Sequence, residues 1–150
     1  MLFVPGTESV AGCGTRVLVA WSATRESTRA PRDALPMLQR ATVAEVLSLG
    51  STHPGSENPL DAVAAYLQAH GVSAACAVSP VRNVSFGDRM LTPSVVDASI
   101  AELLLSRAAD MEASLIVMGG YGHSRTYELV LGRVTRTMLE SMTVPVLMSH

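Results

Sequence analysis

The chain has 150 residues, of which 48% are hydrophobic and 16% are charged, as expected for one globular domain with a sizeable core. Its formal net charge of -2 gives no general attraction to nucleic acid or to an anionic membrane surface, so we expect neither as a partner. All eleven basic residues are arginine, and the absence of lysine excludes Schiff-base chemistry and the lysine-dependent phosphate loop.

Residues 1–15 are rich in small and polar residues and have no hydrophobic periodicity, which predicts a flexible tail or the remnant of a linker. This stretch has neither the basic start nor the long apolar run of a secretory signal, and no run approaches the ~18 apolar residues of a membrane span. Cys13 and Cys76 are too few for a disulfide framework. We therefore expect a cytoplasmic protein, with Cys13 exposed in the tail and Cys76 inert inside a strand.

The first half of the chain predicts two strands separated by a helix. Residues 16–21 ("RVLVAW") are an apolar, β-branched run typical of a strand buried on both faces. The stretch "SATRESTRA" offers several N-caps and predicts a helix that runs to about Arg40, which Pro36 bends or divides. A cap at Ser27 or Thr28 would place Pro31 in its first turn. Residues 42–49 ("TVAEVLSL") predict the second strand.

The second half continues the same alternation of helices and strands. A helix with Leu60 and Leu67 on one face ends at Gly71, and residues 73–81 form the third strand. Apolar residues at spacings of three and four predict a helix over Ser94 to Asp110. The fourth strand lies within residues 114–120, a fourth helix begins near Gly132, and residues 144–150 form the fifth strand.

This alternation predicts a single α/β domain over residues 16–150, a Rossmann-like or flavodoxin-like parallel sheet with helices on both faces. Ligands of such sheets bind beyond the carboxyl ends of the strands, where the strand order reverses. If the first and fourth strands are neighbours there, Trp21 faces the loop that follows Met118. The glycines of that loop and the start of the next helix would suit a phosphate group.

The spacing of the glycines sharpens this prediction. Gly119, Gly122 and Gly132 form the pattern G-x2-G-x9-G, with "LIVMG" before it and "VPVLM" after the helix. Together with "RVLVAW" and "DALPML" near the other end, these motifs closely resemble the universal stress protein family over nearly the whole chain. The resemblance implies five strands in the order 3-2-1-4-5 and, in many members, a dimer paired through the fifth strand. It also implies binding of ATP, with or without Mg²⁺, in the members that keep the glycine pattern.

The family's phosphate-contacting positions fall on Gly119, Gly122, Gly132, Arg133 and Val134. Two residues depart from the family pattern, because Arg133 stands where Ser or Thr supplies a hydroxyl and Ser22 stands where an Asp contacts the nucleotide. Arginine can still form bidentate phosphate contacts, so we retain the prediction of an adenine nucleotide. The full set of predicted nucleotide-binding residues is Trp21, Ser22, Gly119, Gly122, His123, Gly132, Arg133 and Val134.

Several alternatives remain open from the sequence. The glycines would also suit an ordinary turn in a nucleotide-free dimerisation or interaction module, and residues 1–9 resemble a linker between the halves of a tandem protein. Trp21 fits either stacking on adenine or core packing. His123 and Ser124 lack the second glycine of G-x-S-x-G, so we assign no catalytic residue and expect at most slow ATP hydrolysis. The scattered histidines predict no metal site.

Assembly is predicted from the fifth strand. The segment from Val144 to Met148 is apolar and, in the order 3-2-1-4-5, lies at a sheet edge that invites a second strand. We therefore expect a homodimer paired through this edge, although Pro145 removes one hydrogen-bond donor.

Overall fold

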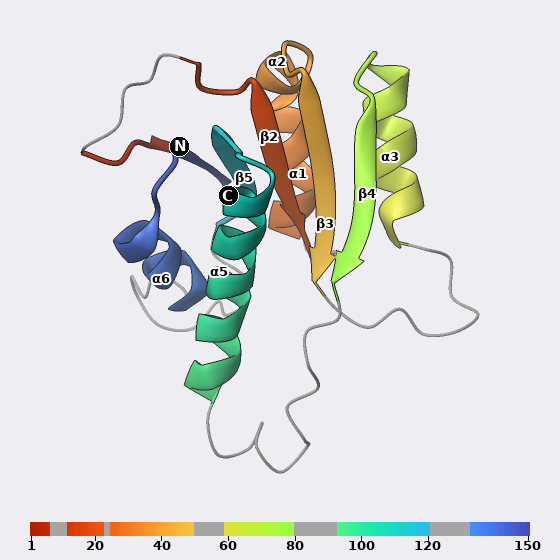
Figure 1. Ribbon diagram of the computed structural model, residues 1–150. Coiled ribbons are helices and arrows are strands. Elements are labelled where there is room, and N and C mark those ends of the chain that lie inside the picture. The colour runs from red at the N-terminus through yellow and green to blue at the C-terminus, as the bar shows by residue number, and fades with distance from the viewer. Residues whose placement is uncertain (7–11, 23–24, 50–58, 80–92, 121–132) are drawn as a thin grey trace.

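The computed structural model describes residues 1–6, 12–22, 25–49, 59–79, 93–120 and 133–150 (Figure 1). In this part of the chain, six strands form one sheet in the order β1-β6-β5-β2-β3-β4. The strands are β1 (Leu2–Phe3), β2 (Arg16–Trp21), β3 (Val43–Leu49), β4 (Ala74–Ser79), β5 (Leu115–Gly119) and β6 (Val146–Ser149). The five expected strands, β2 to β6, are mutually parallel and stand in the relative order 3-2-1-4-5. The sheet differs from the prediction by the additional strand β1.

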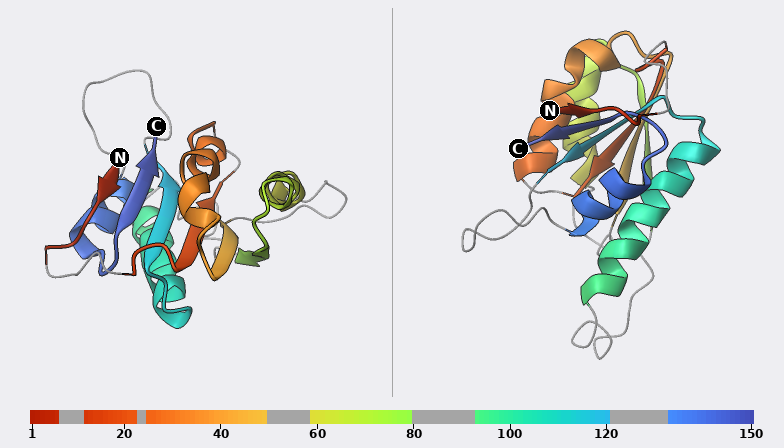
Figure 2. Two further views of the ribbon diagram at one scale, coloured as in Figure 1. Left: turned by 90° about the horizontal axis from the view of Figure 1, so that it is seen from above. Right: turned by 90° about the vertical axis from the view of Figure 1, so that its left-hand side faces the viewer.

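Strand β1 runs antiparallel to β6 and covers its outer edge, with Leu2 opposite Leu147 and Phe3 opposite Val146. The main-chain nitrogen of Met148 donates a hydrogen bond of 2.8 Å to the carbonyl oxygen of Met1. The right-hand view of Figure 2 shows the two strands side by side, with the chain ends close together. The prediction that Val144 to Met148 lies at the edge of the sheet is therefore wrong, because β1 occupies that position.

Helices cover both faces of the sheet, as predicted (Figures 1 and 2). One face carries α1 (Arg25–Asp33), α2 (Leu35–Leu38) and α3 (Pro59–Ala69), and the other carries α5 (Pro93–Asp110) and α6 (Arg133–Ser141). The break at Ala34, two residues before Pro36, confirms that this proline divides the predicted first helix. The placement of Pro31 in a first turn is wrong, because α1 begins at Arg25 and places Pro31 inside the helix.

The predicted end of α3 is confirmed by its hydrogen bonds. Gly71 has φ 77° and donates from its nitrogen to the carbonyl of Gln68, while the nitrogen of Val72 donates to the carbonyl of Leu67. This pair of bonds is a Schellman motif, in which a residue with a left-handed backbone lets its own amide and the next one donate to the last carbonyls of the helix.

Two apolar clusters hold the layers together, one on each face of the sheet. Strand β2 contributes Val17 and Val19 to the cluster under α1, α2 and α3, and Leu18 to the cluster under α5 and α6. All three side chains are fully buried, which confirms a strand enclosed on both faces.

Cys76 lies inside a strand as predicted, whereas the expected exposure of Cys13 is wrong. Cys76 is exposed, because β4 is the outermost strand at its end of the described sheet. Cys13 is partly buried and packs against the cluster under α1, α2 and α3.

Candidate functional site

The carboxyl ends of β2 and β5 meet at one edge of the sheet. The two strands pair in parallel, with Val17 opposite Leu115 and Val19 opposite Val117. Strand β2 is also the point where the order reverses, since β3 and β4 lie on one side of it and β5 and β6 on the other. The expected adjacency of the first and fourth strands is confirmed, and it brings Trp21 and Gly119 to the same edge of the sheet.

Gly119 ends β5 at the point where the first turn of α1 crosses it. A Cβ atom built on Gly119 would lie 2.6 Å from the main-chain nitrogen of Ser27 and 2.8 Å from the carbonyl carbon of Glu26. Real Cβ atoms do not approach backbone so closely, so only glycine lets α1 lie this near to β5. The next residue, Gly120, donates from its nitrogen to the carbonyl of Ser149 at 2.6 Å. The amino-terminal end of α1 is thus held against the ends of β5 and β6.

Trp21 is a core residue that also forms the wall of a small cavity. Its side chain is 7% exposed, and its buried Nε1 has no hydrogen-bond partner among the described residues. The cavity measures about 140 Å³ and lies between α1 and α3, where Arg32 and Tyr66 are among its lining residues. Ligand cavities ordinarily measure ~300–1,000 Å³, so this one is too small for a whole nucleotide.

The remaining predicted site residues are only partly described. Ser22 follows β2 directly and is exposed. Arg133 is the first residue of α6, which agrees with a helix that begins near Gly132, and Val134 packs against the cluster under α5 and α6. Gly122, His123 and Gly132 lie outside the described residues. The structure therefore brings Trp21, Ser22 and Gly119 together.

An ion pair between β3 and α5 was not predicted from the sequence. Arg107 donates from Nε to Oε1 of Glu45 at 2.7 Å and from Nη2 to Oε2 at 2.6 Å. The Glu45 side chain is only 9% exposed and that of Arg107 41%. These bonds raise the pKa of the Arg107 guanidinium, with the negative charge of Glu45 as a further cause. The sequence did contain a sign of this ion pair, because a glutamate in the apolar run "TVAEVLSL" requires a partner when the strand is buried.

Polar contacts also fix the end of β6 to α1. The Ser149 hydroxyl donates to the Asp33 carboxylate, and Nη1 of Arg29 donates to the carbonyl of His150 at 3.2 Å. The last strand is thus tied to the helix whose first turn crosses Gly119.

The cysteine thiols are not activated in this structure. Partial burial raises the pKa of Cys13, and partial loss of water around the otherwise exposed Cys76 thiol, together with the negative charge of Asp61, raises the pKa of Cys76. A raised pKa keeps a thiol protonated at neutral pH and weakens it as a nucleophile.

Among the described residues, no three side chains of His, Cys, Asp or Glu gather as a metal ion requires. None of the described helices has both the length and the apolar character needed to cross a membrane.

Comparisons with known proteins show which family this chain resembles. Solved structures of universal stress proteins share the fold: one from Archaeoglobus fulgidus is 18% identical with a TM-score of 0.66, and one from Burkholderia pseudomallei is 20% identical with a TM-score of 0.59. The match covers 93% of this chain and 46% of the Archaeoglobus chain, and 96% of this chain and 98% of the Burkholderia chain. This chain therefore spans about half the length of the Archaeoglobus protein. A universal stress protein from Lactobacillus plantarum is 16% identical with a TM-score of 0.59, over 92% of this chain and 99% of that one.

A comparison with curated protein sequences gives no match. The model of the universal stress protein family matches residues 15–150, so it includes every strand except β1 and all the described helices. The chain belongs to the universal stress protein family.

Proposed function

We propose that this chain binds an adenine nucleotide, ATP, at the carboxyl ends of β2 and β5, and that it acts as a stress-response regulatory domain. The observation that carries the proposal is the parallel pairing of β2 with β5, which places Trp21, Ser22 and Gly119 at the point where the strand order reverses. The glycine pattern after β5 and the membership of the universal stress protein family support the same ligand.

In this proposal, backbone amides and one arginine hold the phosphates. The amides around Gly122 and Gly132 donate to the phosphate oxygens, while Gly119 starts the loop and keeps its packing against α1, and α6 begins directly after Gly132 at Arg133. Arg133 replaces the family's hydroxyl with a charged donor that is able to form two hydrogen bonds to a phosphate. Ser22, His123 and Val134 complete the contacts, and Mg²⁺, where it is bound, is held by the phosphates. We assign no catalytic residue to this site and expect at most slow hydrolysis.

The adenine ring is proposed to lie against Trp21. The cavity beside Trp21 has a volume of about 140 Å³ and is lined by Tyr66 as well. Because this volume is below that of a whole-ligand pocket, only the ring enters it and the ribose and phosphates stay outside.

A thermal-shift screen with ATP, ADP, AMP and adenosine, each with and without magnesium, tests the proposal. A ligand at ~100 times its dissociation constant stabilises the folded state by ~2.7 kcal/mol, which is a readily measured rise in Tm. We expect ATP to raise the Tm more than adenosine, and Gly122→Val to abolish the rise. No shift with any nucleotide at millimolar concentration would instead favour the nucleotide-free interaction module.

Dimerisation is the second part of the proposal, and a specific observation bears on it. The sheet end formed by β1 and β6 carries exposed apolar side chains, since Met1 is 72%, Leu2 38% and Val4 40% exposed. A homodimer that pairs through Val144 to Met148 requires β1 to leave β6 first. We propose that the two-residue strand β1 competes with a second copy for this edge.

A further inference from the structure

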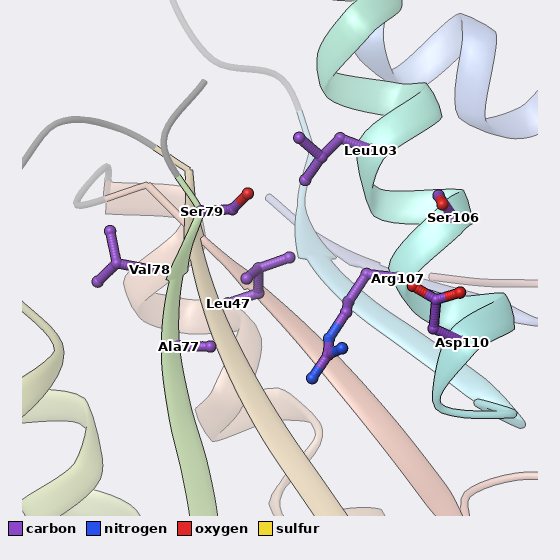
Figure 3. Close-up of a pocket in the computed structure, with 8 residues that line it drawn as sticks. All are labelled: Leu47, Ala77, Val78, Ser79, Leu103, Ser106, Arg107 and Asp110. Atoms are coloured by element: carbon purple, nitrogen blue, oxygen red, sulfur yellow. The ribbon is translucent and has the colours of Figure 1, made fainter. Parts of the chain in front are cut away.

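A second and larger cavity lies between α5 and the outer strands β3 and β4. Its volume is about 400 Å³, within the ~300–1,000 Å³ of small-molecule sites. Figure 3 shows Leu47 and Ala77 extending from the sheet, and Leu103 and Arg107 extending from α5 toward it. This cavity lies on the face of the sheet opposite α3, so it is separate from the cavity beside Trp21.

The α5 side of this cavity changes from apolar to charged along the helix. Leu103, Ser106, Arg107 and Asp110 all line it, and their spacing of three, four and seven residues places them on one helical face. With a rise of 1.5 Å per residue, Leu103 and Asp110 are separated by about 10 Å along the axis. The α5 wall of the cavity therefore has an apolar end at Leu103 and a carboxylate end at Asp110, and the strand wall adds the hydroxyl of Ser79 opposite Leu103 (Figure 3).

The charges at the carboxylate end do not cancel. The guanidinium of Arg107 is compensated by Glu45, to which it makes two hydrogen bonds. Asp110 is exposed, and its negative charge is a further cause of the raised pKa of Arg107, but it makes no hydrogen bond or ion pair with another described residue. One positive and two negative side chains thus leave one net negative charge, and the Ser106 hydroxyl adds an oxygen acceptor nearby.

We propose that this cavity binds small amphipathic cations, in which a primary ammonium group is attached to an unbranched apolar chain of about six carbons. The ammonium group binds to Asp110 and Ser106, and the carbon chain packs on Leu47, Ala77 and Leu103. A carboxylate head group would instead be repelled by the net negative charge that Glu45 and Asp110 leave around Arg107. A second ammonium group at the far end would lose hydration against Leu103 and would find no carboxylate there, since Ser79 offers only a hydroxyl. The site is independent of nucleotide binding at Gly119.

Titrations followed by amide chemical shifts test this site, with hexylamine, hexanoate and 1,6-diaminohexane as probes at one pH and one ionic strength. Hexylamine is expected to give saturable shifts at the lining residues, with an affinity at least about fivefold higher than that of either other probe. Equal binding of hexanoate, or no saturable shift with hexylamine, would overturn the proposal.

Two substitutions on α5 test whether hexylamine binds to the Asp110 carboxylate itself or responds only to the overall negative charge of the protein. Asp110→Asn should lower the affinity for hexylamine about fivefold, the upper range for an exposed ion pair. Glu102→Gln removes the same charge from an exposed position of the same helix outside the cavity and should leave the affinity unchanged. Ala77→Leu should fill the cavity and abolish binding, with its folding checked by circular dichroism. Equal affinities for the two acid-to-amide variants would overturn the assignment of Asp110.

Discussion

Ser27 and Gly119 approach each other so closely that the main-chain nitrogen of Ser27 lies 2.6 Å from the position of a Cβ atom on Gly119. The carbonyl carbon of Glu26 lies 2.8 Å from the same position. Both obstacles are backbone atoms in the first turn of α1, so neither is able to rotate aside. The packing of α1 on β5 therefore requires a glycine here, independently of any ligand.

Gly119→Ala should lower the free energy of unfolding by about 1–3 kcal/mol, the usual cost of forcing an extra methyl group into a packed site. Urea denaturation measures this loss. Gly120→Ala is the matched control, because its added Cβ would meet its nearest neighbours, in Met148 and Ser149, at an ordinary 3.5 Å. The control should change stability by no more than about 0.5 kcal/mol. Equal losses in the two variants would contradict the close approach of α1.

The buried Glu45 gives a second prediction. Arg107→Ala removes the partner of a carboxylate that is only 9% exposed, so it should lower the Tm by several degrees. Replacing both Glu45 and Arg107 by leucine should restore much of the loss, because apolar side chains need no partner. Differential scanning calorimetry measures all three proteins.

Arg136 is the control for this pair, because it donates to Glu140 at 2.8 Å while both side chains remain largely exposed. Arg136→Ala should leave the Tm nearly unchanged, since exposed pairs four residues apart contribute little. A Tm loss as large as that of Arg107→Ala would show that burial of Glu45 is not the cause.

The backbone conformation of Glu112 suggests that replacing this residue will stabilise the folded protein. It has φ 51° at the end of α5, where its nitrogen donates to Ala109 and the nitrogen of Ala113 donates to Ala108. This is the same motif that Gly71 forms after α3, but with a side chain in the left-handed region.

Glu112→Gly should therefore raise the free energy of unfolding by about 0.5–1 kcal/mol, because the relief of strain exceeds the added freedom of the unfolded chain. Gly71→Ala is the reverse change at φ 77° and should lower stability by about 1 kcal/mol. Urea denaturation of both variants checks the signs. A destabilising Glu112→Gly would mean that the side chain makes a compensating contact.

The sequence predicted the elements that have a strong periodicity. Strand β2 and helix α5 follow directly from an apolar run and a stripe at spacings of three and four, and the alternation of strands and helices implied the parallel sheet. Strand β1 was not predicted, because two residues are too few to show an alternating pattern and its partner strand lies at the other end of the chain.

The site was only partly predictable for a related reason. The glycine spacing pointed to the loop after β5, but the closest neighbour of Gly119 is α1, a contact that no motif encodes. The exposure of Cys76 likewise depends on which strand is outermost, and its own apolar neighbours on the chain do not reveal this. Local patterns predict elements, whereas these features arise from tertiary contacts.

The competition between β1 and a second copy predicts the effect of a deletion. Removing residues 1–4 should uncover the amides and carbonyls of β6 and raise the fraction of dimer at micromolar concentration. Light scattering measures the mass of both proteins, and circular dichroism verifies that the shortened chain is folded. A shortened chain that stays monomeric, or a dimer fraction that falls, would exclude pairing through β6.

The last prediction separates a phosphate site from an ordinary turn. Arg133 begins α6 and, in the proposed site, contributes charge where the family has a hydroxyl. Arg133→Ala should weaken ATP binding by about 1.5–3 kcal/mol, the scale of a charge-assisted hydrogen bond, and should leave adenosine affinity unchanged because adenosine has no phosphate. Arg133→Ser should recover part of the ATP affinity, because the serine hydroxyl donates to phosphate alongside the backbone amides. Isothermal titration calorimetry measures both ligands on the three proteins. If Arg133→Ala binds ATP as tightly as the unchanged chain, then Arg133 makes no phosphate contact and its part of the proposed site is wrong.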